Sequence, residues 1–160
     1  MKKTTLLFAI IFMAVAGAKA QTYSTAVGAK FYAGDISVGG INIRHTMAPH
    51  AALEGSLLFF SGAIGVEGLY EYQAPISGVQ GLQYFVGGGG LLAFGSGRYG
   101  RYGIYDNSNT FFALRLTGGV DYKFAEAPID VSLGFDPFFY LVPFTGSNLA
   151  LGIGVRYVIK

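Results

Sequence analysis

The chain contains no cysteine and few charged residues. Without cysteine it can form no disulfide framework, carry no cysteine-linked lipid anchor and build no cysteine metal site. Only 12% of its 160 residues are charged, whereas 52% are hydrophobic, 16% are aromatic and 25 are glycines. This composition is unusual for a soluble protein. The length fits one domain with a sizeable core, and the composition favours contact with lipid or a fibrous assembly.

The first twenty residues have the pattern of a secretory signal peptide. Two lysines precede an apolar run from about Leu6 to Ala16, and the sequence AKA at 18–20 is a small-x-small cleavage pattern. The alternative is an uncleaved membrane anchor, but the apolar run is shorter than the ~20 residues that a spanning helix needs. We therefore expect residues 1–20 to be removed and residues 21–160 to form the mature domain.

Positive charge is also scarce in the mature part of the chain. It has eight Lys and Arg residues against nine Asp and Glu residues, a net charge of −1. Nucleic-acid binding needs a cluster of positive charge, because the phosphate backbone dominates affinity. We therefore expect no nucleic-acid partner.

The mature chain has no long hydrophobic run either. No segment offers about eighteen apolar residues without charges or clustered glycines, which argues against a helical membrane protein. Apolar residues instead alternate with small or charged ones, the pattern of a strand whose two faces meet different surroundings. In the last twelve residues, one face carries Leu149, Leu151, Ile153, Val155, Tyr157 and Ile159, and the other carries two glycines and Arg156.

Eight segments show this alternation or contain it in part, and turn signals separate them. We expect strands at about 24–32, 38–45, 52–60, 64–72, 81–94, 112–124, 129–136 and 149–160. Compact proline-bearing turns at 46–50, 73–78 and 125–129 alternate with connections at 33–37, 61–62, 95–109 and 142–148. Strands of roughly nine to eleven residues suit a tilted crossing of a bilayer. The sequence predicts an all-β fold, an eight-stranded antiparallel up-and-down transmembrane β-barrel with both termini on the side of the proline-bearing turns.

The composition of the two strand faces decides which face points outward. An exterior with so few charges and so many aromatic residues would aggregate in water. Each Lys or Arg facing lipid at mid-depth would cost about 2–4 kcal/mol. We therefore predict a polar network in the lumen, formed by Lys30, Arg44, Glu54, Glu67, Glu71, Arg115, Asp121, Lys123, Asp130, Asp136 and Arg156. An eight-stranded barrel is just wide enough for side chains to fill it, so these groups should pair and plug the lumen.

Two further features complete the predicted barrel. Aromatic residues near the segment ends are expected to form two interfacial girdles: Phe31, Tyr32, Phe59, Phe60, Tyr72, Tyr84, Phe94, Phe111, Tyr122, Phe124, Phe138 and Tyr157. In the stretch YFVGGGGLLAF, Gly87 and Gly89 are expected to face the lumen and to leave room for long charged side chains. The stretch is not a nucleotide-binding loop, because such a loop needs Gly-x-Gly-x-x-Gly or a Lys-Ser/Thr ending between a strand and a helix.

The chain resembles the short outer-membrane β-barrel proteins of Gram-negative bacteria, often labelled porin-family, and is similar in architecture to the OmpA/OmpX-like barrels. The resemblance rests on ALEGSLLF, GVEGLYEYQAPI, GLQYFVGGGG, VDYKFAEAPIDVSLGFDPFF and GIGVRY. It implies an outer-membrane location with periplasmic termini, assembly by the barrel-insertion machinery and no enzyme activity. Such barrels commonly end in an aromatic residue, whereas this chain ends in YVIK, with Lys160 last.

No residues stand out as catalytic, cofactor-binding or metal-binding. A lipid-directed hydrolase would need a Ser-His-acid arrangement near the outer leaflet, but His45 and His50 flank a proline-bearing turn on the opposite side. Two histidines at that spacing also make a poor metal site. Glu67 and Glu71 share a strand face, and pairing with lumen cations explains them better than acid–base catalysis.

The connection 95–109 is the segment whose sequence most clearly indicates a surface function. Its arginines and tyrosines, Arg98, Tyr99, Arg101, Tyr102 and Tyr105, form a candidate contact surface for lipopolysaccharide headgroups or an extracellular partner. A solvated loop whose tyrosines extend the outer girdle is the alternative. The sequence thus predicts a structural or surface-interaction barrel of the cell envelope. A narrow pore for small solutes and a lipid-modifying enzyme remain as alternatives.

Overall fold

A computed structural model describes residues 25–95, 98–99, 104–105, 110–143 and 145–159. Eight strands build the main body: β1 (Thr25–Gly34), β2 (Val38–Ala48), β3 (Ala51–Phe60), β4 (Ala63–Pro75), β5 (Leu82–Gly95), β8 (Thr110–Lys123), β9 (Ile129–Val142) and β10 (Gly146–Ile159). Two short strands, β6 (Arg98–Tyr99) and β7 (Ile104–Tyr105), form a separate hairpin. Among these described residues, no helix is long and apolar enough to cross a membrane.

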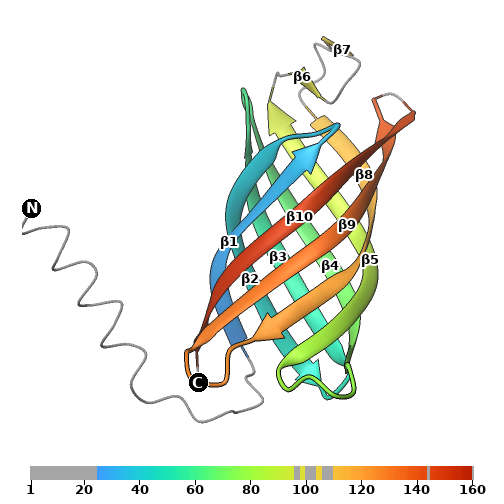
Figure 1. The fold of residues 1–160 in the computed structure, drawn as a ribbon. Coiled ribbons are helices and arrows are strands. Elements are labelled where there is room, and N and C mark those ends of the chain that lie inside the picture. The colour runs from blue at the N-terminus through green and yellow to red at the C-terminus, as the bar shows by residue number, and fades with distance from the viewer. Residues whose placement is uncertain (1–24, 96–97, 100–103, 106–109, 144, 160) are drawn as a thin grey trace, which may run out of the picture.

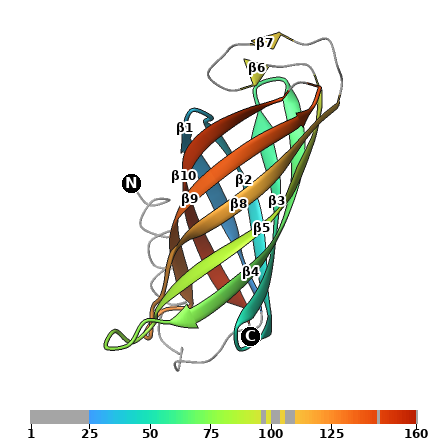
Figure 2. The same cartoon turned by 90° about the vertical axis from the view of Figure 1, so that its right-hand side faces the viewer.

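The eight long strands close into one barrel with antiparallel pairing throughout. Each strand pairs with its neighbours in the chain, and β1 pairs with β10 to close the cylinder (Figure 1). The view turned by 90° shows the strands strongly tilted across the barrel (Figure 2), as closure of a small sheet requires. The prediction of an eight-stranded antiparallel up-and-down barrel is confirmed.

The connections divide between the two ends as the sequence predicts. The proline-bearing turns lie at the end where β1 begins and β10 finishes (Figure 1). The β6–β7 hairpin lies at the opposite end. There the two-residue turn between β3 and β4 places Gly62 at φ +87°, a conformation that glycine adopts without strain.

β9 extends furthest beyond its predicted end, although other strands, such as β2 and β4, also run past theirs. The prediction stops it at residue 136, but β9 continues through Pro137 to Val142. The β8–β9 ladder passes from Arg115↔Phe138 to Gly118↔Phe135, so the proline, which has no N–H, falls in a gap of the ladder. The longer strand brings Phe138 and Tyr140 into the barrel wall as inward-facing residues.

Candidate functional site: the barrel lumen

The lumen holds most of the charged side chains of the described residues. Of the eleven residues predicted there, ten are buried: Lys30, Arg44, Glu54, Glu67, Glu71, Arg115, Asp121, Asp130, Asp136 and Arg156. The eleventh, Lys123, is half-buried at the end of β8, on the side of the proline-bearing turns. These residues come from all the long strands except β5. The network therefore links seven of the eight strands through side chains inside the barrel.

Arg156 is the centre of the first group of ion pairs. Its Nη2 lies 2.6 Å from Glu54 Oε2, and its Nη1 donates to Asp130 Oδ1 at 2.8 Å. Its Nε donates to the amide oxygen of Asn42 at 2.5 Å. Lys30 binds the other oxygen of Glu54. A buried carboxylate is therefore shared by two cations, which compensates for its removal from water.

Arg44 and Arg115 organise two further groups. Arg44 bridges Glu71 on β4, at 2.7 Å, and Asp121 on β8, at 2.5 Å. Arg115 bridges Glu67, at 2.6 Å, and Asp136, at 3.2 Å. Three of these four links join strands that are not neighbours in the wall, and the fourth, Arg115–Asp136, joins the adjacent strands β8 and β9. Bidentate guanidinium groups suit such bridges because their donors are held in a rigid fork.

Glu67 accepts two further hydrogen bonds besides its pairing with Arg115. The Tyr32 hydroxyl donates to Glu67 Oε1 at 2.7 Å, and the Ser56 hydroxyl donates to the same oxygen at 3.2 Å. Four strands thus meet at one carboxylate: β1, β3, β4 and β8. Ion pairing and hydrogen bonding account for Glu67 and Glu71 in the lumen, as expected from their position opposite cationic residues.

Above the ion pairs, toward the end opposite the proline-bearing turns, the lumen is filled by an apolar cluster. Its larger members are Tyr32, Ile36, Val38, Leu58, Leu91, Phe111, Phe138 and Tyr140. The rings of Phe111 and Tyr140 lie 4.8 Å apart, and those of Tyr32 and Phe138 pack edge to face at 5.5 Å. The Arg115 guanidinium lies 3.4 Å from the Phe138 ring centroid, so a cation–π contact joins the two layers.

This cluster corrects part of the girdle prediction. Tyr32, Phe111 and Phe138 were expected at the lipid interface, but all three are buried inside the barrel. Each lies an even number of residues from a lumen-facing residue of the same strand: Tyr32 from Lys30, Phe111 from Arg115 and Phe138 from Asp136. Alternate residues of a strand point to the same face, so these three side chains also point inward. The interpretation of the lumen as a purely polar plug is therefore incomplete, since aromatic rings fill part of it.

The glycine prediction needs a similar correction. A Cβ on Gly89 would meet only the backbone of β4, and one on Gly87 would overlap the Tyr70 carbonyl oxygen first and also crowd the Glu71 side chain. Both glycines therefore permit a close approach of two strands, and only Gly87 also leaves room for a charged side chain. Gly152 and Gly154 leave room for polar groups more directly. A Cβ on Gly152 would overlap Asp136 Oδ2, and one on Gly154 would overlap Ser132 Oγ and crowd Arg156.

The exterior of the barrel is almost entirely apolar. Large hydrophobic side chains are exposed on every long strand, among them Phe31, Ile43, Leu57, Val66, Val86, Leu116, Phe135 and Ile153. Charged side chains alternate with them and point inward. The barrel is thus inverted relative to a soluble one, with its charges inside and its hydrophobic residues outside.

The two histidines lie at the end with the proline-bearing turns. His45 Nδ1 lies 2.9 Å from the Thr25 hydroxyl, and His50 Nδ1 lies 3.0 Å from the Gln73 carbonyl oxygen. The His50 ring stacks on Tyr72. Within the described part of the chain, no group of three or more His, Asp or Glu residues has a geometry that could hold a metal ion.

The candidate contact surface of the connection 95–109 is described only in part. The backbones of Arg98 and Tyr99 pair with those of Tyr105 and Ile104 in the β6–β7 hairpin. Arg101 and Tyr102 lie outside the described residues, as does the predicted signal peptide.

Comparison with known proteins supports the architecture. No protein-family model matches the chain, and no curated protein matches it. Among solved structures, the chain is similar to the N-terminal β-barrel domain of Pseudomonas aeruginosa OprF, with a TM-score of 0.63 and 17% sequence identity. The match covers 86% of this chain and 100% of that domain. At this identity the likeness shows the fold, an eight-stranded barrel of the kind expected from the sequence.

Proposed function

We propose that the protein is an integral outer-membrane β-barrel with a closed lumen and a structural or surface-interaction role in the envelope of a Gram-negative bacterium. The inversion of the barrel is the observation that carries this proposal. An exterior of large apolar side chains is stable in lipid, whereas in water it would expose far more than the few hundred Å² usual for a monomer. The likeness to the OprF domain supports the same location.

The termini would face the periplasm in this arrangement. A chain with an even number of strands has both ends on one side, here the side of the proline-bearing turns. Short turns on the periplasmic side and longer loops outside are the usual pattern of outer-membrane barrels. The connection between β5 and β8, with its cationic and aromatic residues, would then face the cell exterior, where lipopolysaccharide or an extracellular partner could bind it.

The lumen supports a closed barrel better than a pore. Three arginine-centred groups cross it, and the apolar cluster fills the level above them. A permeating ion would have to displace buried ion pairs, and breaking one buried pair costs about 3–5 kcal/mol. No enzymatic role is proposed, because His45 and His50 lie at the end away from the outer leaflet and bind Thr25 and the Gln73 carbonyl.

Recordings from planar bilayers test the closed lumen. The protein, refolded and reconstituted, should insert without producing a steady conductance. A reproducible unitary conductance from the wild-type chain would favour the alternative, a narrow pore for small solutes. The matched positive control is a variant with Arg115→Ala and Phe138→Ala, which removes one side chain from the ion pairs and one from the apolar cluster.

A further inference from the structure

We propose that a hollow on the outer face of β2, β3, β4 and β5 binds one phospholipid, with an acyl chain against the glycines and the phosphate at His45. This inference rests on the proposed membrane location. The hollow has a volume of about 500 Å³. That volume falls in the range of roughly 300–1,000 Å³ typical of ligand pockets.

Glycines create the floor of this hollow. Gly55 and Gly68 face outward and are paired across β3 and β4, and Gly88 faces outward on β5 beside Tyr70. Nothing lies within 4 Å of the place where a Cβ on Gly68 would sit. The gap therefore lies among the large exposed side chains of Ile43, Leu53 and Tyr70, and a void there would lose dispersion contacts.

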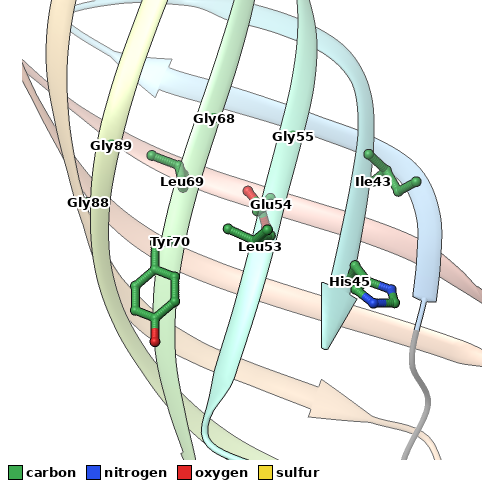
Figure 3. Close-up of a pocket in the computed structure, with 10 residues that line it drawn as sticks. All are labelled: Ile43, His45, Leu53, Glu54, Gly55, Gly68, Leu69, Tyr70, Gly88 and Gly89. Carbon is green, nitrogen blue, oxygen red and sulfur yellow. The ribbon is translucent and has the colours of Figure 1, made fainter. Parts of the chain in front are cut away.

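Apolar side chains surround the floor and polar groups mark one end. Ile43, Leu53 and Tyr70 line the hollow and are exposed, while Glu54 contributes to the lining but has its carboxylate bound to Lys30 and Arg156 inside the barrel. Figure 3 shows the Tyr70 ring extending toward the same end of the barrel as His45. This arrangement of an apolar floor with polar groups at one end matches an amphiphile.

His45 has the geometry to meet a phosphate. It is exposed, lines the hollow and lies near the last residues of β2, at the end with the proline-bearing turns. When the Thr25 hydroxyl donates to Nδ1, the ring proton resides on Nε2, which is then a donor for a phosphate oxygen. In the proposed orientation this end lies in the periplasmic leaflet, so the occupant would be a phospholipid of that leaflet.

Native mass spectrometry with phosphatidylglycerol tests the site. The wild-type barrel, refolded in detergent and titrated with the lipid, should retain one molecule at low lipid concentration. Gly68→Leu fills the floor and should weaken that retention about tenfold, a change of about 1.4 kcal/mol in binding free energy. His45→Ala should also weaken it, because the phosphate loses its donor.

Gly118→Leu is the matched control. Gly118 also faces outward, and a Cβ there would lie 3.7 Å from the Phe85 carbonyl oxygen, an ordinary contact, but it is not part of the hollow. This variant should retain the lipid as the wild type does. Equal retention by the wild type, Gly68→Leu and Gly118→Leu would overturn the proposal.

Two further readouts keep the outcome decisive. If Gly68→Leu does not fold, Gly55→Ala replaces it, since its Cβ would lie 3.5 Å from Ile43 Cγ2 without overlap. Insertion of the wild type into vesicles is measured in parallel. A chain that fails to insert contradicts the membrane location and the lipid site together, whereas a chain that inserts but shows equal retention contradicts only the lipid site.

Discussion

Arg156 on β10 and Glu54 on β3 form an ion pair of 2.6 Å across the lumen, between strands that are separated in the wall by β1 and β2. Both side chains are buried. Backbone pairing cannot supply this link, because each strand hydrogen-bonds only to its two neighbours. Side-chain pairs of this kind therefore fix the shape of the barrel from within.

A double-mutant cycle measures how much the Arg156–Glu54 ion pair contributes to the free energy of unfolding. Arg156→Met, Glu54→Gln and the double variant are compared by urea unfolding in detergent. We expect a coupling of about 0.5–3 kcal/mol, because the two groups are in contact and share a network. Additive effects, within about 0.5 kcal/mol, would show that the pair does not stabilise the barrel.

Replacement of Glu67 should lower the heat resistance of the folded barrel. Glu67→Ala leaves the buried Arg115 without its closest carboxylate and removes the acceptor of Tyr32 and Ser56. Loss of one partner from a buried pair costs about 3–5 kcal/mol. The measurement is the temperature at which the compact band converts to the unfolded band on a semi-native gel.

Glu126→Ala is the control for that experiment. Glu126 is an exposed acid in the turn between β8 and β9, and its removal should change stability by less than about 0.5 kcal/mol. If both variants melt at the same temperature as the wild type, the lumen carboxylates do not stabilise the fold.

Two adjacent phenylalanines test the apolar cluster. Phe138 is fully buried and contacts Arg115, whereas Phe139 is 40% exposed on the outer face. Phe138→Ala should cost about 3–5 kcal/mol by leaving a cavity in the lumen. Phe139→Ala should cost clearly less in the same unfolding measurement, because its side chain leaves no internal cavity. A reversed order would mean that the lumen is not packed at this level.

Phe138 and Tyr32 show what the sequence could and could not predict. Alternation predicted the eight strands and their direction, because charged residues fix which parity faces the lumen. The sequence misplaces Phe138 because the predicted strand ends at Asp136, before Pro137, so the inward direction of Asp136 does not extend to Phe138. Tyr32 lies two residues beyond Lys30 and should have followed it inward, but its position near a strand end favoured the interfacial interpretation.

Other features could not be predicted from one strand at a time. Several ion pairs depend on which strands face each other across the closed barrel: Arg44 with Asp121, Arg115 with Glu67 and Arg156 with Glu54. The roles of the glycines depend on curvature, which determines whether a Cβ meets backbone, as at Gly87, or a lumen side chain, as at Gly152.

Removal of the connection between β5 and β8 tests the surface role. Deletion of residues 96–108 should leave the barrel folded, since the hairpin is separate from the barrel sheet. If this connection is a contact surface, the deletion should reduce binding to purified lipopolysaccharide or to cells. Unchanged binding, with the compact gel band retained, would remove the adhesion hypothesis.

Arginine placed at two depths on the outer face tests the central claim, that this face meets lipid. Ile153 lies near the middle of β10 and Ile159 at its end, and both point outward with similar exposure, 45% and 46%. The measurement is the free energy of unfolding in phospholipid vesicles. We predict that Ile153→Arg costs about 2–4 kcal/mol and Ile159→Arg about 0–1 kcal/mol, because a charge is most costly at the bilayer midplane. Equal, small costs at both positions would contradict a lipid-facing exterior.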